Sequence, residues 1–295
     1  MKKFILIITV IIGFGYSAIS QEIAPYIKIG ETNESIQKAS ENIIAALEKN
    51  SFTILGSYNP SGKSDLKVIA FTQNNLKNTV IKVKDRGALA AIFKVGLVKT
   101  DGKVIMSYTN PDYILRAYLQ DDFKKYKTQL QNFGEDLKTA FSSIGSDFTQ
   151  FGGTVDAEDL KDYHYKIMMP YFTDPVELKE FASFEEGVRI IEKNLNAQKG
   201  DTKLVYKLVF ASEKVAVFGI GLENAEDGEP NFLPKIGEAH AAALPYEIIL
   251  QGKEATMLHG KYRIALHWPE LSMGTFMKIM STPGDIEDML EELCQ

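Results

Sequence analysis

The chain carries the same succession of helix-like and strand-like patterns twice, and this repetition constrains the fold more than any other feature. Each copy begins with apolar residues at helical spacing, in residues 34–50 and again in residues 184–195. Two short β-rich runs separated by turn-forming residues follow in each copy, then a loop and a further pair of runs. A repeated unit of this kind predicts an α+β protein of two tandem repeats with antiparallel sheets.

Two short matches between the copies support the repetition. Glu-Lys-Asn occurs at residues 48–50 and at 192–194, an offset of 144. Asp-Gly-Lys at 101–103 matches His-Gly-Lys at 259–261, an offset of 158. These offsets predict that the second copy is longer by about 14 residues, partly in an exposed acidic loop at residues 223–230.

Strand and helix boundaries are predicted from turn residues and periodicity. Asp101-Gly102 is a strong two-residue hairpin signal. Residues 121–144, with apolar side chains every three or four positions, predict one long amphipathic helix. For the first helix, at residues 34–50, the predicted N-cap is Thr32 or Asn33. The strands are predicted at residues 52–55, 66–71, 90–98, 104–108, 204–210, 215–220, 246–250 and 257–266, with C-terminal helix over 272–292.

The first 20 residues have the pattern of a secretory signal peptide. Lys2 and Lys3 precede an apolar run, and Ala18-Ile19-Ser20 resembles a cleavage site. The apolar stretch is shorter than the roughly 20 residues that a membrane-spanning helix needs. We therefore expect a signal peptide at 1–20, a first repeat with a long helical C-terminal extension at 21–150, and a second repeat at 155–295 after Gly152-Gly153. The mature protein is expected to be periplasmic or secreted, with no membrane span.

Charge and cysteine content exclude several classes of function. Removing residues 1–20 leaves 31 basic and 39 acidic residues, a net charge of −8. An acidic chain with scattered bases is repelled by nucleic acid and anionic membranes, so neither is an expected partner. Cys294 is the only cysteine, which rules out an intramolecular disulfide or a zinc cluster of cysteines.

The order of elements, with Ala-Ala-Leu-Pro-Tyr at 242–246 before a strand and Pro111 or Pro269 after the last one, resembles domain-of-unknown-function family 302. The resemblance covers most of residues 24–118 and 161–292, although the first copy has Ala90-Ala91 where the second has Leu-Pro. It implies a fold like that of the TATA-binding protein, a curved antiparallel sheet with helices on one face in each repeat. It implies no established activity and no catalytic residues.

No motif for a cofactor, a metal or catalysis stands out. Gly56 and the Gly-Lys-Ser at 62–64 imitate a phosphate loop, but five residues separate the glycines and a strand follows. A hairpin turn is therefore the favoured interpretation. Gly219 and Gly221 lack the third glycine of a dinucleotide fingerprint.

The most unusual local feature is a basic stripe in the predicted strand at 257–266. Alternation places His259, Lys261, Arg263 and His267 on one face and Trp268 on the other. Arg263 can hold a carboxylate or phosphate through its fork, so these four residues are the candidate ligand-binding site. The alternative, which we favour, is that these residues form an ordinary solvent-exposed face of a sheet and bind no ligand. In a strand, His259 and His267 lie roughly 26 Å apart and cannot share a metal.

Two strands look apolar on both faces. In the strand at 204–210, Leu204, Tyr206, Leu208 and Phe210 alternate with Val205 and Val209. In the strand at 215–220, Ala216, Phe218 and Ile220 alternate with Val215 and Val217. Either the other repeat or an apolar ligand must then cover the face that the helices leave open.

These observations favour an exported, non-enzymatic binding protein for a small molecule or protein partner, using the sheet surface or the cleft between repeats. The alternative is a hydrolase or isomerase with a His/carboxylate pair, for which Glu254, Glu270, His240 and His267 are the available residues. A third interpretation is a purely structural envelope-associated protein.

Overall fold

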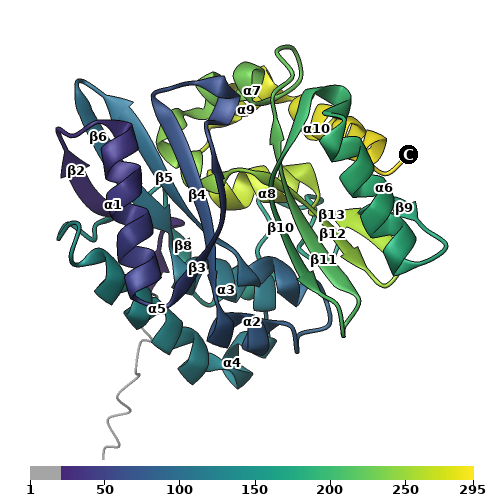
Figure 1. The fold of residues 1–295 in the computed structure, drawn as a ribbon, viewed down its shortest axis with the longest axis horizontal. Helices are drawn as coiled ribbons and strands as arrows, with labels where there is room; N and C mark the ends of the chain where they lie inside the picture. The colour runs from purple at the N-terminus through teal and green to yellow at the C-terminus, as the bar shows by residue number, and fades with distance from the viewer. Residues whose placement is uncertain (1–20) are drawn as a thin grey trace, which may run out of the picture.

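The computed structural model describes residues 21–295, so the predicted signal peptide lies outside the described residues. The fold is α+β, as predicted, with three antiparallel sheets. The larger two lie side by side, and α1 and α6 cover the same side of the pair (Figure 1). α8 lies between the two sheets.

The two large sheets arrange their strands in the same order. The six-stranded sheet has the order β3-β4-β5-β6-β2-β7, and the five-stranded sheet has the order β10-β11-β12-β13-β9. β1 and β8 form a small separate ribbon. The strands are β1 Glu22–Ile23, β2 Tyr26–Thr32, β3 Phe52–Tyr58, β4 Leu66–Gln73, β5 Phe93–Thr100, β6 Lys103–Thr109, β7 Gln150–Phe151, β8 Val155–Asp156, β9 Val176–Glu180, β10 Thr202–Phe210, β11 Val215–Leu222, β12 Tyr246–Gln251 and β13 Glu254–Met257.

Helices connect and cover these strands. The α-helices are α1 Ile36–Lys49, α2 Asn74–Val80, α3 Pro111–Leu119, α4 Asp122–Lys125, α5 Lys127–Phe141, α6 Phe184–Asn196, α7 Glu229–Ile236, α8 Gly260–His267, α9 Met273–Phe276 and α10 Thr282–Glu292. The 3₁₀ helices are η1 Pro60–Gly62, η2 Gly87–Ala91, η3 Asp159–Asp162, η4 Lys199–Asp201, η5 Glu238–Ala243 and η6 Met277–Ile279.

The predicted hairpins are confirmed. β3 pairs with β4 across η1, so the Gly-Lys-Ser segment is a turn and opens no helix. β5 pairs with β6, and Asp101 and Gly102 between them have φ of 51° and 79°. Positive φ at both turn residues is the geometry that the Asp-Gly pair favours. β10 pairs with β11 as expected.

Three expectations about helices are corrected. The cap of α1 is Ser35, whose Oγ accepts from the Lys38 amide, and not Thr32 or Asn33. The single long helix predicted over 121–144 is divided at Tyr126 into α4 and α5, although the apolar spacing continues across the break. Residues 260–266 form α8 and not a strand, so the strand predicted at 257–266 is wrong.

The two sequence matches fall on different structural positions in the two halves. Asn50 is the C-cap of α1, whereas Asn194 lies inside α6. Residues 101–103 are a hairpin turn, whereas His259 begins α8. The acidic loop prediction is also corrected at one point, because Glu229 is fully buried at the start of α7.

One continuous core of buried apolar residues runs through both sheets. The sheets approach at their edge strands, β3 and β10. Gly56 permits this approach, because a Cβ there would lie 1.9 Å from the carbonyl oxygen of Val205. Strand pairing also crosses the predicted boundary at Gly152-Gly153, since β8, which follows these glycines, pairs with β1.

Candidate functional site

The four residues of the predicted stripe lie on a helix and divide between its faces. His259 caps α8, its Nδ1 accepting from the Lys261 amide at 3.2 Å. Arg263 and His267, four residues apart, are each 2% exposed, while Lys261 is exposed. Four-residue spacing places side chains on one helix face, so only Arg263 and His267 come together.

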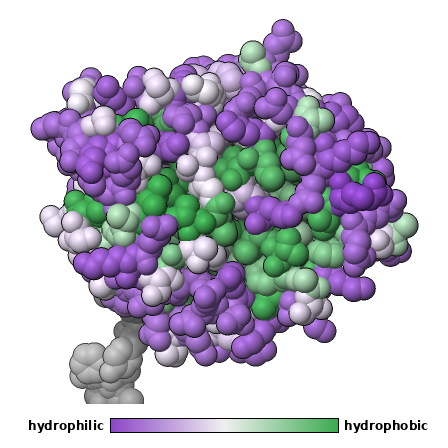
Figure 2. Space-filling view, in the orientation of Figure 1, coloured by the Kyte–Doolittle hydropathy of each residue, from purple (hydrophilic) through white to green (hydrophobic). Residues whose placement is uncertain are grey.

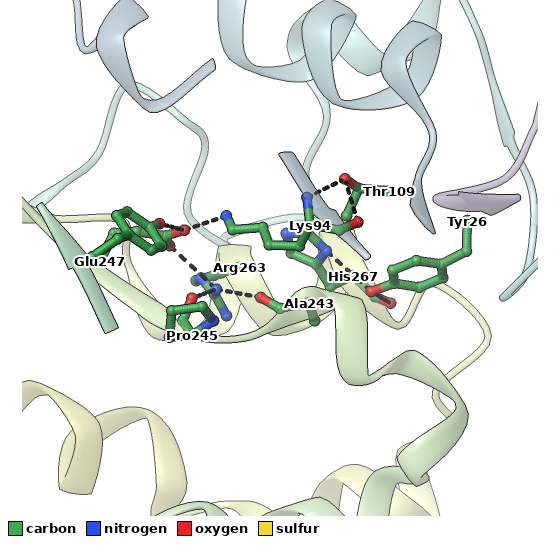
Figure 3. Close-up of polar contacts among 9 residues, drawn as sticks. Tyr26, Lys94, Thr109, Ala243, Pro245, Glu247, Arg263 and His267 are labelled. Atoms are coloured by element: carbon green, nitrogen blue, oxygen red, sulfur yellow. Dashed lines mark hydrogen bonds and ion pairs between the residues drawn. The ribbon is translucent and has the colours of Figure 1, made fainter. Parts of the chain in front are cut away.

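Arg263 binds a carboxylate, as its chemistry predicts, but the carboxylate belongs to the same chain. Its Nη2 donates to Glu247 Oε2 at 3.2 Å and to the carbonyl oxygens of Ala243 at 2.5 Å and Pro245 at 2.7 Å (Figure 3). The guanidinium lies 3.8 Å from the centre of the Tyr246 ring. Nη2 is therefore satisfied by groups of the same chain, whereas Nε and Nη1 are buried without a hydrogen-bond partner among the described residues.

Glu247 is shared by two cations from different parts of the fold. Its Oε1 pairs with Nζ of Lys94, which β5 contributes, and accepts from the Tyr206 hydroxyl at 3.0 Å. Burial alone raises the pKa of Glu247, but Lys94 and Arg263 outweigh it and hold that pKa below its usual range. Burial lowers the pKa of Lys94, and the negative charge of Glu247 opposes this shift only in part.

His267 connects the buried charged residues to the six-stranded sheet through Tyr26. The Tyr26 hydroxyl, from β2, lies 3.1 Å from His267 Nδ1 and 3.1 Å from its carbonyl oxygen. Burial, followed by the positive charges of Arg263 and Lys94, lowers the pKa of His267 well below its usual value. The ring is therefore neutral at pH 7.

A histidine and a carboxylate do meet, as the alternative function requires. His240 Nε2 lies 3.2 Å from Glu270 Oε1, and its Nδ1 lies 3.1 Å from the His267 carbonyl oxygen. Because a carbonyl oxygen only accepts, Nδ1 carries a proton, and the hydrogen bond between Nε2 and the Glu270 carboxyl holds a second proton that these two groups share. The His240 side chain is 5% exposed, that of Glu270 is 57% exposed, and the ring stacks on Trp268. Burial lowers the pKa of His240, while Glu270 opposes that shift.

The buried contacts of Arg263, Glu247 and His267 therefore stabilise the packing of the fold and do not form a site that a solute can enter. Lys94 and Tyr26 come from the six-stranded sheet, Glu247 from the five-stranded sheet, and Arg263 and His267 from α8 (Figure 3). All five are buried. The Glu247 carboxylate meets both cations, Lys94 and Arg263, and such pairing is how buried charge is tolerated in a protein interior.

An open apolar groove lies elsewhere, between α6 and β10. Its volume is about 640 Å³, and Phe184, Val188 and Val209 supply its apolar surface. Figure 2 shows apolar side chains gathered over this part of the strand face, bordered by hydrophilic ones. Lys207 of β10 pairs with Glu192 of α6 beside the groove.

A second groove of about 600 Å³ lies where the two halves meet. Lys82, Val83 and Lys84 line one side, and Val215 and Gln251 line the other. Gln251 Nε2 donates to the Lys84 carbonyl oxygen at 2.8 Å across the junction.

The sequence predicted that β10 is apolar on both faces, but it placed Leu204 on the wrong face. A bulge leaves Val205 unpaired, so Leu204 and Tyr206 pair with Ile220 and Gly219 and face opposite sides. Leu204 thus joins Val209 on the side of α6. Both faces of β11 are covered, since all of its residues are buried.

Similarity to known proteins assigns no role to this site. Neither a protein-family model nor a curated protein matches the chain. Within residues 21–295, no group of three or more His, Cys, Asp or Glu side chains is placed to hold a metal ion. In the same range, every helix is too short or too polar to cross a membrane.

Proposed function

We propose that this chain is a non-enzymatic binding protein that holds an apolar small molecule in the groove between α6 and β10. The observation that carries the proposal is Val209, which is 39% exposed and lines a groove together with two further apolar residues, Phe184 and Val188. A volume of about 640 Å³ falls within the usual range for small-molecule sites. An exposed apolar surface rimmed by polar side chains is typical of a binding site.

Binding of the neutral apolar dye Nile red tests this proposal. We expect Val209→Asp to weaken dye binding at least about tenfold, because a carboxylate in the groove is costly to desolvate. Ile167→Asp is the matched control, since Ile167 is apolar, 86% exposed and outside the groove. Equal binding by both variants would contradict the proposal.

We further propose that the two halves are copies of one module, related as members of family 302 and folded like the TATA-binding protein. Equivalent strands occupy equivalent places in the two sheet orders. Ser35 and Ser183 cap α1 and α6 from positions 148 apart. The unpaired bulge residues Leu55 and Val205 are 150 apart, and Ile29 and Leu178 are 149 apart.

This spacing supports one nearly constant offset in place of the offsets of 144 and 158 from the sequence matches. An experimental structure tests the duplication directly. Residues 26–119 and 176–267 should superimpose strand for strand, and a failure to superimpose would reject it.

Export of the mature chain is a separate proposal, which rests on the pattern of residues 1–20. N-terminal sequencing of protein recovered from the periplasm or medium should begin at Gln21. Recovery of the intact chain from the cytoplasm alone would contradict export.

The second candidate function is acid or base catalysis by His240, which its contact with Glu270 favours. A histidine and a carboxyl group that share a proton can exchange it with a substrate as general acid and base. The activated ester p-nitrophenyl acetate provides a general probe. If the pair is catalytic, hydrolysis by the natural chain should exceed that by His240→Gln, and equal rates would remove this candidate.

A further inference from the structure

Three methionines form an exposed stripe near the C-terminus. Met273, Met277 and Met280 are 49%, 57% and 60% exposed. Met273 lies on α9, Met277 lies on η6 and Met280 directly follows η6, and the backbone at Phe276, Met277 and Met280 has right-handed helical φ and ψ. Spacings of four and three residues place the three side chains on one side of this continuous helical segment.

The three methionines do not hold this helical segment against the rest of the protein. Ile279 is 1% exposed and Phe276 lines a small cavity with Trp268, so these two residues hold the segment against the protein. Apolar residues at helical spacing ordinarily face a core. Here the buried side is supplied by other residues, and the methionines are left facing outward.

The donor atoms around the stripe are unusual as well. Residues 271–281 contain no Asp, Glu, His or Cys, and their only charged side chain is Lys278. Within this segment, oxygen-seeking cations such as Mg²⁺ and Ca²⁺ find no carboxylate. Thioether sulfur is a soft ligand and selects Cu(I).

We propose that Met273, Met277 and Met280 together bind one Cu(I) ion through their thioether sulfurs. Met277 is the middle ligand, one helical turn from each of the others. Neighbours on a helix face have Cβ atoms about 5–6 Å apart, and the methionine side chain has three rotatable bonds, so the sulfurs can converge on one ion. Exposure leaves the ion a direct path to the site.

Ag(I), which has the same charge and softness and is not readily oxidised, serves as the probe. We expect native mass spectrometry of the full mature chain to show one Ag(I) bound. Replacing all three residues, Met273→Leu, Met277→Leu and Met280→Leu, should abolish this adduct, because leucine keeps the apolar volume and removes the sulfur. Each single replacement should lower affinity at least about tenfold. The control is Met168→Leu, since Met168 is 97% exposed and outside the stripe.

Cys294 carries the only thiol of the chain, which is a further soft ligand, and it is buried. NMR of chains labelled at the methionine methyl groups separates the two sites. Ag(I) should shift the signals of the three stripe methionines and leave Met106 and Met257 unchanged. Unfolded variants are recognised by circular dichroism, and a folded single variant then carries the test. No bound ion, silver retained by the folded triple variant, or loss caused by Met168→Leu alone would each overturn the proposal.

Discussion

Glu247 lies between Lys94 and Arg263, with its side chain 7% exposed, and takes hydrogen bonds from both and from Tyr206. Removing one member of a buried ion group leaves the others without compensation, which costs more than the group contributes when intact. The consequence of losing this carboxylate should therefore be far larger than for a carboxylate on the surface.

We predict that Glu247→Gln lowers the free energy of unfolding by about 3–5 kcal/mol. Glu192→Gln is the matched control, because Glu192 also pairs with a lysine, Lys207, but at the surface. Its cost should be about 1 kcal/mol or less. Urea denaturation of the two variants measures both values. A loss from Glu247→Gln no larger than that of the control would show that the buried group contributes little.

Glu229 is a second buried carboxylate, and it links the halves. It accepts from the Tyr58 hydroxyl at 2.7 Å and from the amides of Ser61 at 3.0 Å and Leu222 at 3.3 Å. Burial raises its pKa from 4.5 to about 7, and these hydrogen bonds only partly oppose the shift. The folded protein therefore favours the protonated carboxyl more than the unfolded chain does.

This shift predicts a stability that depends on pH. The contribution of Glu229 is complete below about pH 4.5 and is lost as the pH rises through about 7. Relative to Glu229→Gln, the natural chain should lose about 3 kcal/mol between pH 4.5 and pH 8. Urea denaturation across this range measures the difference, with Glu226→Gln correcting for the removal of one charge. A difference that does not vary with pH would contradict the shift.

At the scale of elements, the bulged edge strands decide how the two sheets meet. β3 and β10 are the edge strands of their sheets, and both carry a bulge. An exposed edge invites further pairing, and bulges are a common way to prevent it. Gly56 lies at the bulge of β3, where the Val205 carbonyl leaves no room for a side chain.

We predict that Gly56→Ala lowers the free energy of unfolding by about 1–3 kcal/mol, the usual cost of forcing atoms into a packed region. Gly134→Ala is the control, since Gly134 lies in α5 and its added Cβ would find its nearest neighbour at 3.9 Å. That substitution should stabilise the protein by up to about 1 kcal/mol, because alanine favours helix. Thermal unfolding measures both. A neutral Gly56→Ala would mean that β3 and β10 can separate without cost.

At the scale of the whole molecule, the halves share both a core and a set of buried charges. The Lys94 to Glu247 pair and the Tyr58 to Glu229 hydrogen bond each connect them. Neither half can be removed without exposing buried charge and apolar surface from the other.

We therefore predict that the chain unfolds in a single cooperative transition. Trp268 is the only tryptophan and is buried in the second half, so its fluorescence reports that half alone. Circular dichroism reports both halves. The two urea transitions should coincide, as two-state unfolding requires. Tryptophan fluorescence that changes at a different urea concentration would show that the halves unfold separately.

The sequence by itself determined the features that depend on neighbouring residues. The Asp101-Gly102 turn, the hairpins and the outward and inward faces of α6 follow from local conformational preference and apolar spacing. The α+β class follows from their order along the chain.

Only the tertiary structure decided what depends on distant partners. α8 could not be recognised because nearly all of its residues are buried, so no polar face marks its helical period. The bulge in β10 reversed the face of Leu204, since a single unpaired residue shifts the alternation. Arg263 offers the same fork in either fold, but the carboxylate that occupies it, Glu247, is brought there only by packing α8 against β12.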